Sequence, residues 1–341
     1  MAETPRVPLR RRLFLLAAAG LVPVIIMSGL LAPLVATAQS EKVWQVGFLT
    51  GGARPPDGLP PLALRQALQE LGYAEHRNVA YVVRWADARQ ERLPALAAEL
   101  VALNVHAIVT VGGPATEAAR QATSSIPIVM GLVGDAVALG LINSLARPGG
   151  NVTGVTDESV ALSAKRLELL KEAVPKAARM AILYNADDRG MTRRYREVER
   201  AAQVLHVTVL SLGMREPDDF DAAFQAMVQH RPDALFLVTD ALTLLNRRRV
   251  IEFAEKHRIP AMFEVDSLVR DGGLMSYGAS PDDNFRRAAV YLDRLFKGAA
   301  PSTLPVERPS RYYLAVNLKT ARGLGLTLPP SLLQRADQVL E

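Results

Sequence analysis

The chain has 341 residues, no cysteine and a formal net charge of +5 at neutral pH. The lack of cysteine excludes disulfides, thiolate metal sites and thiol nucleophiles. Four arginines and one glutamate fall in the first 38 residues, so the remainder carries only +2. Its charges alternate in sign, as in Lys165-Arg166-Leu167-Glu168, and we expect no nucleic-acid partner.

The N-terminus reads RRRLFLLAAAGLVPVIIMSGLLAPLVATAQ over residues 10–39. A basic head, an uncharged middle and the Ala36-Thr37-Ala38 pattern are typical of an export signal. The order Arg-Arg-Leu-Phe-Leu resembles the twin-arginine type. We predict a signal over residues 1–38, cleaved near Ala38-Gln39, and a periplasmic protein. The alternative is an uncleaved anchor, because the stretch is long enough to cross a bilayer.

From residue 43 onward, short β-branched runs alternate with helical patterns. The first half predicts strands at 43–49, 79–84, 107–111 and 126–130 and helices at 62–71, 92–103, 114–122 and 138–145. RPGGNVTG at 147–154 interrupts the pattern, because proline and glycine pairs favour turns. The alternation then resumes, with helices at 162–173, 193–205, 220–229 and 244–257 and strands at 180–184, 207–211, 234–238 and 261–263.

The C-terminal part is less regular. It predicts a strand at 272–278, a helix at 282–296, an extended proline-rich connector at 301–316 that leads to a strand, and helices at 318–324 and 330–340. Repeated strand–helix units predict an α/β fold, here two doubly wound lobes with parallel sheets joined by crossover strands. We assign residues 43–153 plus 275–308 to the first lobe and residues 154–274 plus 309–341 to the second.

Common catalytic signatures are missing from the chain. It has no phosphate-binding P-loop, no H-E-x-x-H, no G-x-S-x-G and no G-x-G-x-x-G. The five histidines lack the spacing of metal ligands. We therefore expect no enzyme activity, no metal and no cofactor. Candidate binding residues are instead expected at the carboxyl ends of the strands, where open α/β sheets bind ligands.

The best-defined candidate in the first lobe is TVGGPATEAA at residues 110–119. Gly112 and Gly113 would let the backbone approach a ligand, and Pro114 suits the first position of a helix. The N–H groups of Ala115 and Thr116 and the Thr116 hydroxyl would then face an anion such as a carboxylate. The alternative is an ordinary tight turn between a strand and a helix.

Other polar residues also follow predicted strands. They are Thr50 and Asp135 in the first lobe and Asn185, Asp187, Asp240, Thr243 and Glu264 in the second. Each acidic residue has helix N-capping as its alternative and commoner use. As a group they would line one cleft, where their negative charge would hold an ammonium or another cationic group while the first lobe holds the anion.

Several stretches of the chain resemble one family: LGYAEHRNV, RWADARQERLPALAAELV, PGGNVTGV, AKRLELLKEAVPKAARMAILYN and LPVERPSRYYLAVNLKTARGLGLTLPPSLL. The chain resembles the substrate-binding proteins of ABC transporters, in the group of tryptophan- and tyrosine-type binding proteins. The resemblance implies the type 1 periplasmic-binding-protein fold, a small-molecule ligand in the interlobe cleft, and an ABC permease with its ATPase as partners. We expect a monomer.

The resemblance also bears on single residues. Amino-acid binders of this group tend to have Thr-Pro where this chain has Gly113-Pro114, so Thr116 and backbone amides would replace that threonine. Where they have Asp-Pro, this chain has Asp135-Ala136, and Asp240 matches an acidic position of the group.

The predicted function is that of an extracytoplasmic solute-binding protein of an ABC importer. It would capture a small polar molecule, amino-acid-like or a carboxylate, and deliver it to the permease. The alternative is a sensory protein that presents its closed form to a membrane receptor. Genes for a permease and an ATPase beside it would favour import, and a gene for a sensor kinase would favour signalling.

Overall fold

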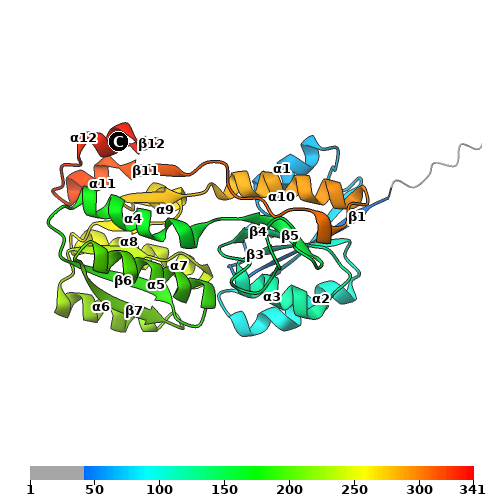
Figure 1. Cartoon of the computed structure of the whole chain (residues 1–341), viewed down its shortest axis with the longest axis horizontal. Coiled ribbons are helices and arrows are strands. Elements are labelled where there is room, and N and C mark those ends of the chain that lie inside the picture. The colour runs from blue at the N-terminus through cyan, green and yellow to red at the C-terminus, as the bar shows by residue number, and fades with distance from the viewer. Residues whose placement is uncertain (1–41) are drawn as a thin grey trace, which may run out of the picture. The chain divides into compact units, whose positions relative to one another are not determined.

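The structure is a computed structural model that describes residues 42–341. Two sheets, each flanked by helices, form two lobes (Figure 1). The export signal predicted for residues 1–38 lies outside the described residues. In the part of the chain that the structure describes, no helix has the length and apolar character needed to cross a membrane.

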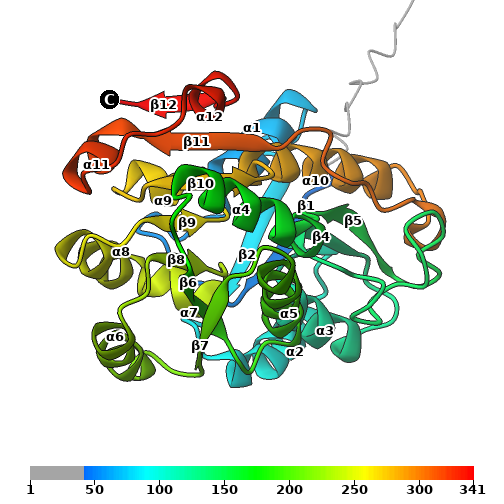
Figure 2. The same cartoon turned by 60° about the vertical axis from the view of Figure 1, so that its left-hand side comes forward.

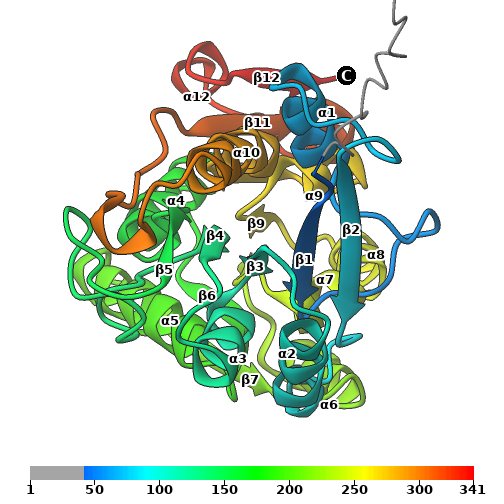
Figure 3. The ribbon, with the colours of Figure 1, turned by 90° about the vertical axis from the view of Figure 1, so that its right-hand side faces the viewer.

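The first lobe contains a five-stranded parallel sheet in the order β2-β1-β3-β4-β5. Its strands are β1 (Trp44–Thr50), β2 (Val79–Trp85), β3 (Ala107–Val111), β4 (Ile128–Val133) and β5 (Val152–Thr156). Apolar side chains pack on both faces of this sheet, because its strands are buried on both sides. One face is covered by α1 (Leu62–Glu70) and α10 (Pro281–Phe296), and the other by α2 (Leu93–Ala102) and α3 (Gly113–Ala122) (Figure 3). The short helix η1 (Gln90–Arg92) directly precedes α2.

The second lobe contains a seven-stranded sheet in the order β12-β11-β10-β9-β8-β6-β7. All neighbouring strands are parallel except β10 and β11, which are antiparallel. The strands are β6 (Arg179–Asn185), β7 (Thr208–Met214), β8 (Ala234–Leu237), β9 (Ala261–Phe263), β10 (Met275–Gly278), β11 (Tyr313–Asn317) and β12 (Gln338–Leu340). The helices are α4 (Ser159–Ala173), α5 (Arg189–Val204), α6 (Asp219–His230), α7 (Ala241–Leu245), α8 (Arg247–Lys256), α9 (Asp266–Arg270), α11 (Leu318–Gly323) and α12 (Pro330–Gln334).

The chain passes between the lobes three times: from β5 to α4, from β10 to α10, and from the short helix η2 (Pro301–Thr303) to β11. Figure 2 shows the third passage leading into β11. The first and third passages lie side by side, because the Thr156 amide donates to the Glu307 carbonyl (2.9 Å) and the Glu307 amide donates to the Gly154 carbonyl (3.0 Å). The two passages are therefore one hydrogen-bonded connection.

Glu158 lies between β5 and α4, at the centre of the first passage. Its φ of 52° is in the left-handed region, which few residues other than glycine adopt. The Glu158 carboxylate accepts a hydrogen bond from the Thr156 hydroxyl (3.0 Å) and pairs with Arg308 of the third passage (3.5 Å). Side-chain contacts from both passages thus hold this backbone conformation.

The structure differs from the sequence-based expectations at four places. Residues 138–145 form turns in place of the predicted helix, which was wrong: Gly140 has a φ of 73°, and Leu141 and Ile142 are buried without helical geometry. The C-terminal helix ends at Gln334, and residues 338–340 form β12.

The other two differences concern the limits of the lobes. The stretch 147–154 was expected to interrupt the pattern with turns, and the first lobe to end at residue 153. Residues 152–154 instead belong to β5, so the first sheet extends to Thr156. Strand β10 pairs with β9 and β11 of the second sheet, so the chain returns to the first lobe at α10 and not at residue 275.

Candidate functional site

A cavity of about 270 Å³ lies between the lobes, at the carboxyl ends of the strands. Its first-lobe wall consists of the turn after β1, the turn between β3 and α3, and nearby side chains. These residues are Thr50, Gly51, Gly52, Gln90, Leu93, Val111, Gly112, Pro114, Ala115 and Leu132. No charged residue belongs to this wall. The first lobe therefore contributes shape and backbone groups.

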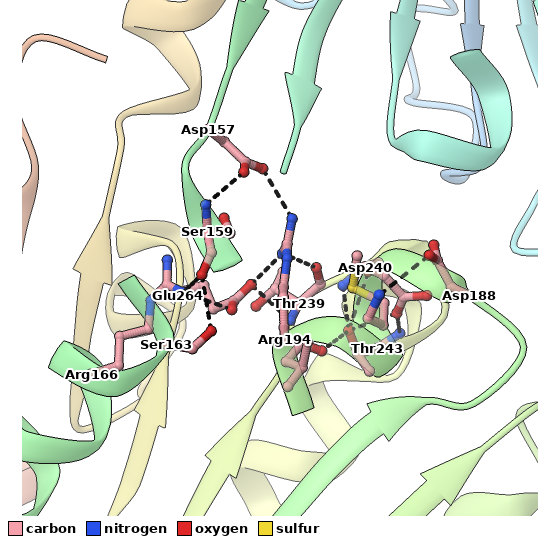
Figure 4. A network of polar contacts seen from close by, with 12 residues as sticks. Asp157, Ser159, Ser163, Arg166, Asp188, Arg194, Thr239, Asp240, Thr243 and Glu264 are labelled. Atoms are coloured by element: carbon pink, nitrogen blue, oxygen red, sulfur yellow. Dashed lines mark hydrogen bonds and ion pairs between the residues drawn. The ribbon is translucent and has the colours of Figure 1, made fainter. Parts of the chain in front are cut away.

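The opposite wall and the first passage carry all the charged side chains that line the cavity. They are Asp157, Arg166, Asp188, Arg194, Asp240 and Glu264 (Figure 4). Uncharged residues of this wall include Met191, Leu244 and Val265. Within residues 42–341, no cluster of histidines and acidic residues is arranged to hold a metal ion.

Glu264, at the end of β9, is the centre of a buried ionic cluster (Figure 4). Its Oε1 accepts a hydrogen bond from Nη1 of Arg166 (2.9 Å), and its Oε2 accepts one from Nη1 of Arg194 (2.7 Å). The Thr239 amide donates to the same Oε2 (3.1 Å). All three ionic side chains are almost fully buried, with 1–6% of each exposed. Buried charges need such pairing, because removal from water is costly for each ion.

Both arginines also reach the passages between the lobes. Arg166 donates to the carbonyls of Tyr277 (2.6 Å) and Ser159 (2.9 Å). Arg194 donates from Nη2 to Oδ2 of Asp157 (3.2 Å). Burial lowers the pKa of Arg166, and Glu264 opposes this shift only in part. Burial also acts to lower the pKa of Arg194, but the carboxylates of Glu264 and Asp157 outweigh it, and the net shift is upward.

Asp188 and Asp240 are the N-caps of α5 and α7. Oδ1 of Asp188 accepts from the amides of Gly190 (2.7 Å) and Met191 (3.3 Å), and Oδ1 of Asp240 accepts from the amide of Thr243 (2.9 Å). Neither carboxylate forms an ion pair with any residue in the range 42–341. Burial raises the pKa of both acids, and the negative charge of Asp240 raises that of Asp188 further.

Five of the residues predicted from the sequence line this cavity: Thr50, Gly112, Ala115, Asp240 and Glu264. The structure corrects the role of Glu264. It was expected to offer negative charge to a ligand, but both of its oxygens are occupied by the two arginines. Asp240 is at once a cap and a cavity residue, so the two interpretations of this position do not exclude each other.

Three predicted residues are turned into the protein and do not line the cavity. The Thr116 hydroxyl donates to the Gly112 carbonyl (2.9 Å), and the Thr116 amide donates to the same oxygen (3.2 Å). Neither group therefore faces a ligand as expected. Thr243 completes the capping box with Asp240, and the Asn185 side chain donates to Oδ2 of Asp240 (2.6 Å). Asn185 and Thr243 thus position the Asp240 carboxylate.

The last three predicted residues line smaller neighbouring hollows. Gly113 and Asp135 border one of these, and Gly113 and Asp187 border another. Asp135 pairs with Arg193 (3.1 Å) and accepts from the Ala138 amide (3.0 Å). Asp187 is 60% exposed and pairs with Arg215 (3.1 Å). Both aspartates lie outside the main cavity.

The sequence interpretation missed Asp157, Arg166, Asp188 and Arg194. Helical periodicity contained a signal for the two arginines. Arg166 occupies the buried stripe of α4 four residues from Leu162 and from Leu170, and Arg194 follows Met191 on the buried stripe of α5. A charged residue on the buried face of a helix needs a partner, and Glu264 at a strand end is that partner.

The model of the family described as ABC transporter substrate binding protein matches residues 62–340. The chain belongs to the ABC transporter substrate binding protein family. This confirms the family resemblance found in the sequence. The family is one of solute-binding proteins, and its members act outside the cytoplasm.

The chain is also similar to a curated protein and to solved structures over most of its length. The chain is 26% identical over 262 residues to a tyrosine-binding protein of Clostridioides difficile (strain R20291), covering 76% of this chain and 75% of that protein. Two solved structures share the fold with a TM-score of 0.80. One is an ABC domain in complex with L-Trp from Streptococcus pneumonia (24% identity; 88% and 100% coverage), and the other is a conserved domain protein from Vibrio cholerae (25%; 87% and 100%). The predicted fold class is confirmed.

Proposed function

We propose that this family member is the binding protein of an ABC importer that captures an amino-acid-like molecule between its lobes. The observation that carries the proposal is the difference in charge between the two walls of the cavity. The first-lobe wall is neutral, and the wall facing it holds two carboxylates that form no ion pair within residues 42–341. The captured molecule would pass to a membrane permease powered by an ATPase, which are the partners that the family implies.

The charges of the cavity favour a ligand with a cationic group. Arg166 and Arg194 pair with Asp157 and Glu264, which leaves Asp188 and Asp240 without an ion pair within residues 42–341. The charge of Arg194 lowers the pKa of Asp188 but does not outweigh its burial. An ammonium group between these two carboxylates would offset their repulsion and their burial. The α-amino group of an amino acid has this charge.

The neutral wall suits the other end of an amino acid. The N-terminus of α3 lies at the cavity beside Gly112 and Ala115, and its positive helix dipole favours a carboxylate. The Gly112 amide itself donates to the Leu132 carbonyl (2.8 Å), so the dipole, and not this amide, is what the wall offers. Leu93, Leu244 and Val265 offer apolar contact to a side chain. A volume of about 270 Å³ is close to the lower end of the range of about 300–1,000 Å³ for small-molecule pockets, which suits one small molecule and not a peptide.

Relatives bind ligands of this class: one is named for tyrosine, and another was solved with L-Trp. No phenylalanine, tyrosine or tryptophan lines the cavity among residues 42–341. An aromatic ligand would therefore be held by aliphatic side chains and not by ring stacking. Leucine-like and methionine-like amino acids belong in any screen for the same reason.

Capture would work through closure of the lobes about the three passages. A ligand that touches both walls stabilises the closed arrangement, and only to the extent that it prefers that arrangement. The proposed twin-arginine signal over residues 1–38 would deliver the protein to the periplasm. Sequencing the N-terminus of the exported protein would test cleavage near Ala38.

The direct test is a thermal-shift screen of residues 39–341 with amino acids, small carboxylates, purines and sugars. A ligand at 100 times its Kd adds about 2.7 kcal/mol of stability. We expect hits among zwitterionic amino acids and none among the matching carboxylates that lack the amine. The Asp240→Asn variant should lose these hits. Hits confined to sugars or purines would overturn the proposal.

A further inference from the structure

Two successive arginines of α5 form ion pairs with the first lobe or with the passage attached to it. Arg194 pairs with Asp157 (3.2 Å), and Arg193 pairs with Asp135 (3.1 Å). The two ion pairs have similar N–O distances, but the Arg194–Asp157 pair is mostly buried and the Arg193–Asp135 pair is largely exposed. The side chains of Arg194 and Asp157 are 6% and 14% exposed, whereas those of Arg193 and Asp135 are 44% and 35% exposed. Solvent and salt screen the second pair far more than the first.

Asp157 is attached to the first lobe although it lies next to the second. Its amide donates to the Val133 carbonyl at the end of β4 (2.9 Å). The next residue, Glu158, has the left-handed backbone described above, and α4 of the second lobe begins at Ser159. The Asp157 side chain also accepts from the Ser159 amide (2.9 Å), so Asp157 is bonded to both lobes. A rotation of the lobes about this short segment therefore changes the position of the Asp157 backbone relative to Arg194.

Arg194 is fixed to the second lobe by its other bonds. Its Nη1 donates to Glu264 (2.7 Å) and to the Thr239 carbonyl (3.3 Å). The guanidinium plane thus spans from the floor of the cavity to the attachment point of the first lobe (Figure 4). Opening the lobes would separate Nη2 of Arg194 from Asp157 and expose the carboxylate to water.

We propose that Arg194 and Asp157 form a buried latch that stabilises the closed arrangement of the lobes. Arg194 is then a positioning residue: it sets how readily the cleft closes, whether or not it touches the ligand. The latch rests on the proposed function only in that closure captures the ligand.

Weakening the latch changes ligand affinities in a different pattern from the loss of a direct ligand contact. When only the closed form binds, the apparent Kd equals the intrinsic Kd divided by the closed fraction. A weaker latch therefore weakens the binding of every ligand by the same factor. Loss of a direct contact such as Asp240 weakens only those ligands that carry the matching group.

The closed fraction can be measured without a ligand. A Cβ on Gly51 would lie 3.3 Å from Cβ of Ala241, across the cavity. Disulfides have Cβ atoms about 3.5–4.5 Å apart, so Gly51→Cys with Ala241→Cys can form one in the closed form after a small adjustment. The chain has no other cysteine. In a glutathione buffer, the ratio of disulfide-bonded to reduced protein is measured at equilibrium. In the variant with Gly51→Cys and Ala241→Cys, this ratio gives the effective concentration of one introduced thiol next to the other. The effective concentration is proportional to the fraction of molecules that are closed.

In this background we expect Asp157→Asn to lower the effective concentration at least about tenfold, because it removes one charge-assisted bond. Asparagine keeps the oxygen that accepts from the Ser159 amide (2.9 Å), so the start of α4 is preserved. The matched control, Asp135→Asn, should lower it no more than about threefold, as for an exposed pair. Arg194→Lys should also lower the effective concentration. The double variant Asp157→Asn with Arg194→Lys should lower it no more than the more severe of the two single substitutions, because both remove the same ion pair.

Circular dichroism checks whether each variant is folded. If Asp157→Asn does not fold, Arg194→Lys is used to test the latch. Unchanged oxidation in Asp157→Asn would overturn the latch, as would an equal loss in Asp135→Asn. The measurement involves no ligand. A failed ligand screen with a working latch would therefore reject only the proposed ligand class, and the reverse result would reject only the latch.

Discussion

The two walls of the cavity differ in kind. The first-lobe wall is made of glycines, small residues and aliphatic side chains, without a charge, whereas the second-lobe wall and the adjoining passage hold six charged residues. Each lobe has the same strand–helix architecture and places the same edge of its sheet toward the cavity. The difference shows that the fold supplies the position of the cavity, while side chains of one lobe and the adjoining passage supply its charge.

The charged wall itself has two layers. Arg166, Glu264 and Arg194 form a compensated cluster, which makes the wall rigid but leaves little charge for a ligand. Asp188 and Asp240 are uncompensated and are held at helix N-termini, where the helix dipole stabilises negative charge. Four predictions distinguish the compensated cluster, the two aspartates and the neutral wall by their effects on stability, ligand affinity and pH dependence.

The largest effect is expected from Glu264→Ala. The substitution leaves two arginines buried together without their shared carboxylate, and breaking a buried pair costs about 3–5 kcal/mol. The free energy of unfolding in urea should fall by that amount. The control is Asp187→Ala, which removes the ion pair of Asp187 (60% exposed) with Arg215 (65% exposed). This substitution should change the free energy of unfolding by about 0.5 kcal/mol or less. Equal effects would show that the cluster adds no stability.

The next effect concerns ligand affinity. Asp240→Asn keeps an oxygen for the Thr243 amide and removes the charge, so an amino-acid ligand should bind about 10- to 100-fold more weakly, as for one charge-assisted bond. The free energy of unfolding of the empty protein should change little, because relief of a buried charge is offset by loss of the acceptor for the Asn185 side-chain amide. Isothermal titration calorimetry and urea unfolding check the two parts. Unchanged affinity together with lower stability would mean that Asp240 serves only as a cap.

On the neutral wall, Gly112→Ala should destabilise the protein by about 1–2 kcal/mol. Gly112 has a φ of 88° and a ψ of 156°, a backbone region that is essentially confined to glycine, while the nearest atom to an added Cβ would be 3.9 Å away. The loss would therefore come from the backbone and not from a clash. Gly52→Ala, where φ is not positive, is the matched control and should be close to neutral in urea unfolding. A comparable loss in both variants would contradict the backbone origin.

The smallest effect is a pH dependence. The pKa values of Asp188 and Asp240 are raised from the ordinary 3.8 by burial, so the folded empty protein binds protons more tightly than the unfolded chain. Their contribution to stability is therefore greatest below about pH 4 and is lost as the pH rises through the raised values. Urea unfolding from pH 4 to 7 should show this slope, and Asp188→Asn with Asp240→Asn should reduce it. A ligand with an ammonium group should bind more tightly as the pH rises over the same range.

The fold was largely predictable from the sequence, because buried parallel strands and amphipathic helices have distinct periodicities. The prediction failed where local and tertiary signals conflict. β5 was obscured by the preceding Pro148-Gly149-Gly150, and its sequence VTGVT contains a glycine at φ 122° whose added Cβ would lie 2.4 Å from the Met130 carbonyl. The apolar residues 138–145 fit a helix, but Gly140 turns the chain there.

The site was only partly predictable. Strand ends indicated Gly112, Ala115, Asp240 and Glu264, because the edge of a parallel sheet is fixed by topology. The pairing of Arg166 and Arg194 with Glu264 was not predictable, since each pair joins residues 98 or 70 positions apart. The inward orientation of the Thr116 hydroxyl likewise depends on Thr110 of the neighbouring strand.

The position of α10 determines when the first lobe can be completed. This helix covers one face of the first sheet, where Phe285 and Tyr291 pack beside strands formed more than 150 residues earlier. The Tyr73 hydroxyl donates to Asp293 (3.0 Å) across 220 residues of sequence. The N-terminal lobe therefore stays incomplete on a nascent chain until residue 296 has been made, although its five strands end at Thr156. The second lobe waits still longer, for β11 and β12 at residues 313–340. Neither lobe can be completed while only its own continuous segment has been made, because each depends on contacts far apart in the sequence.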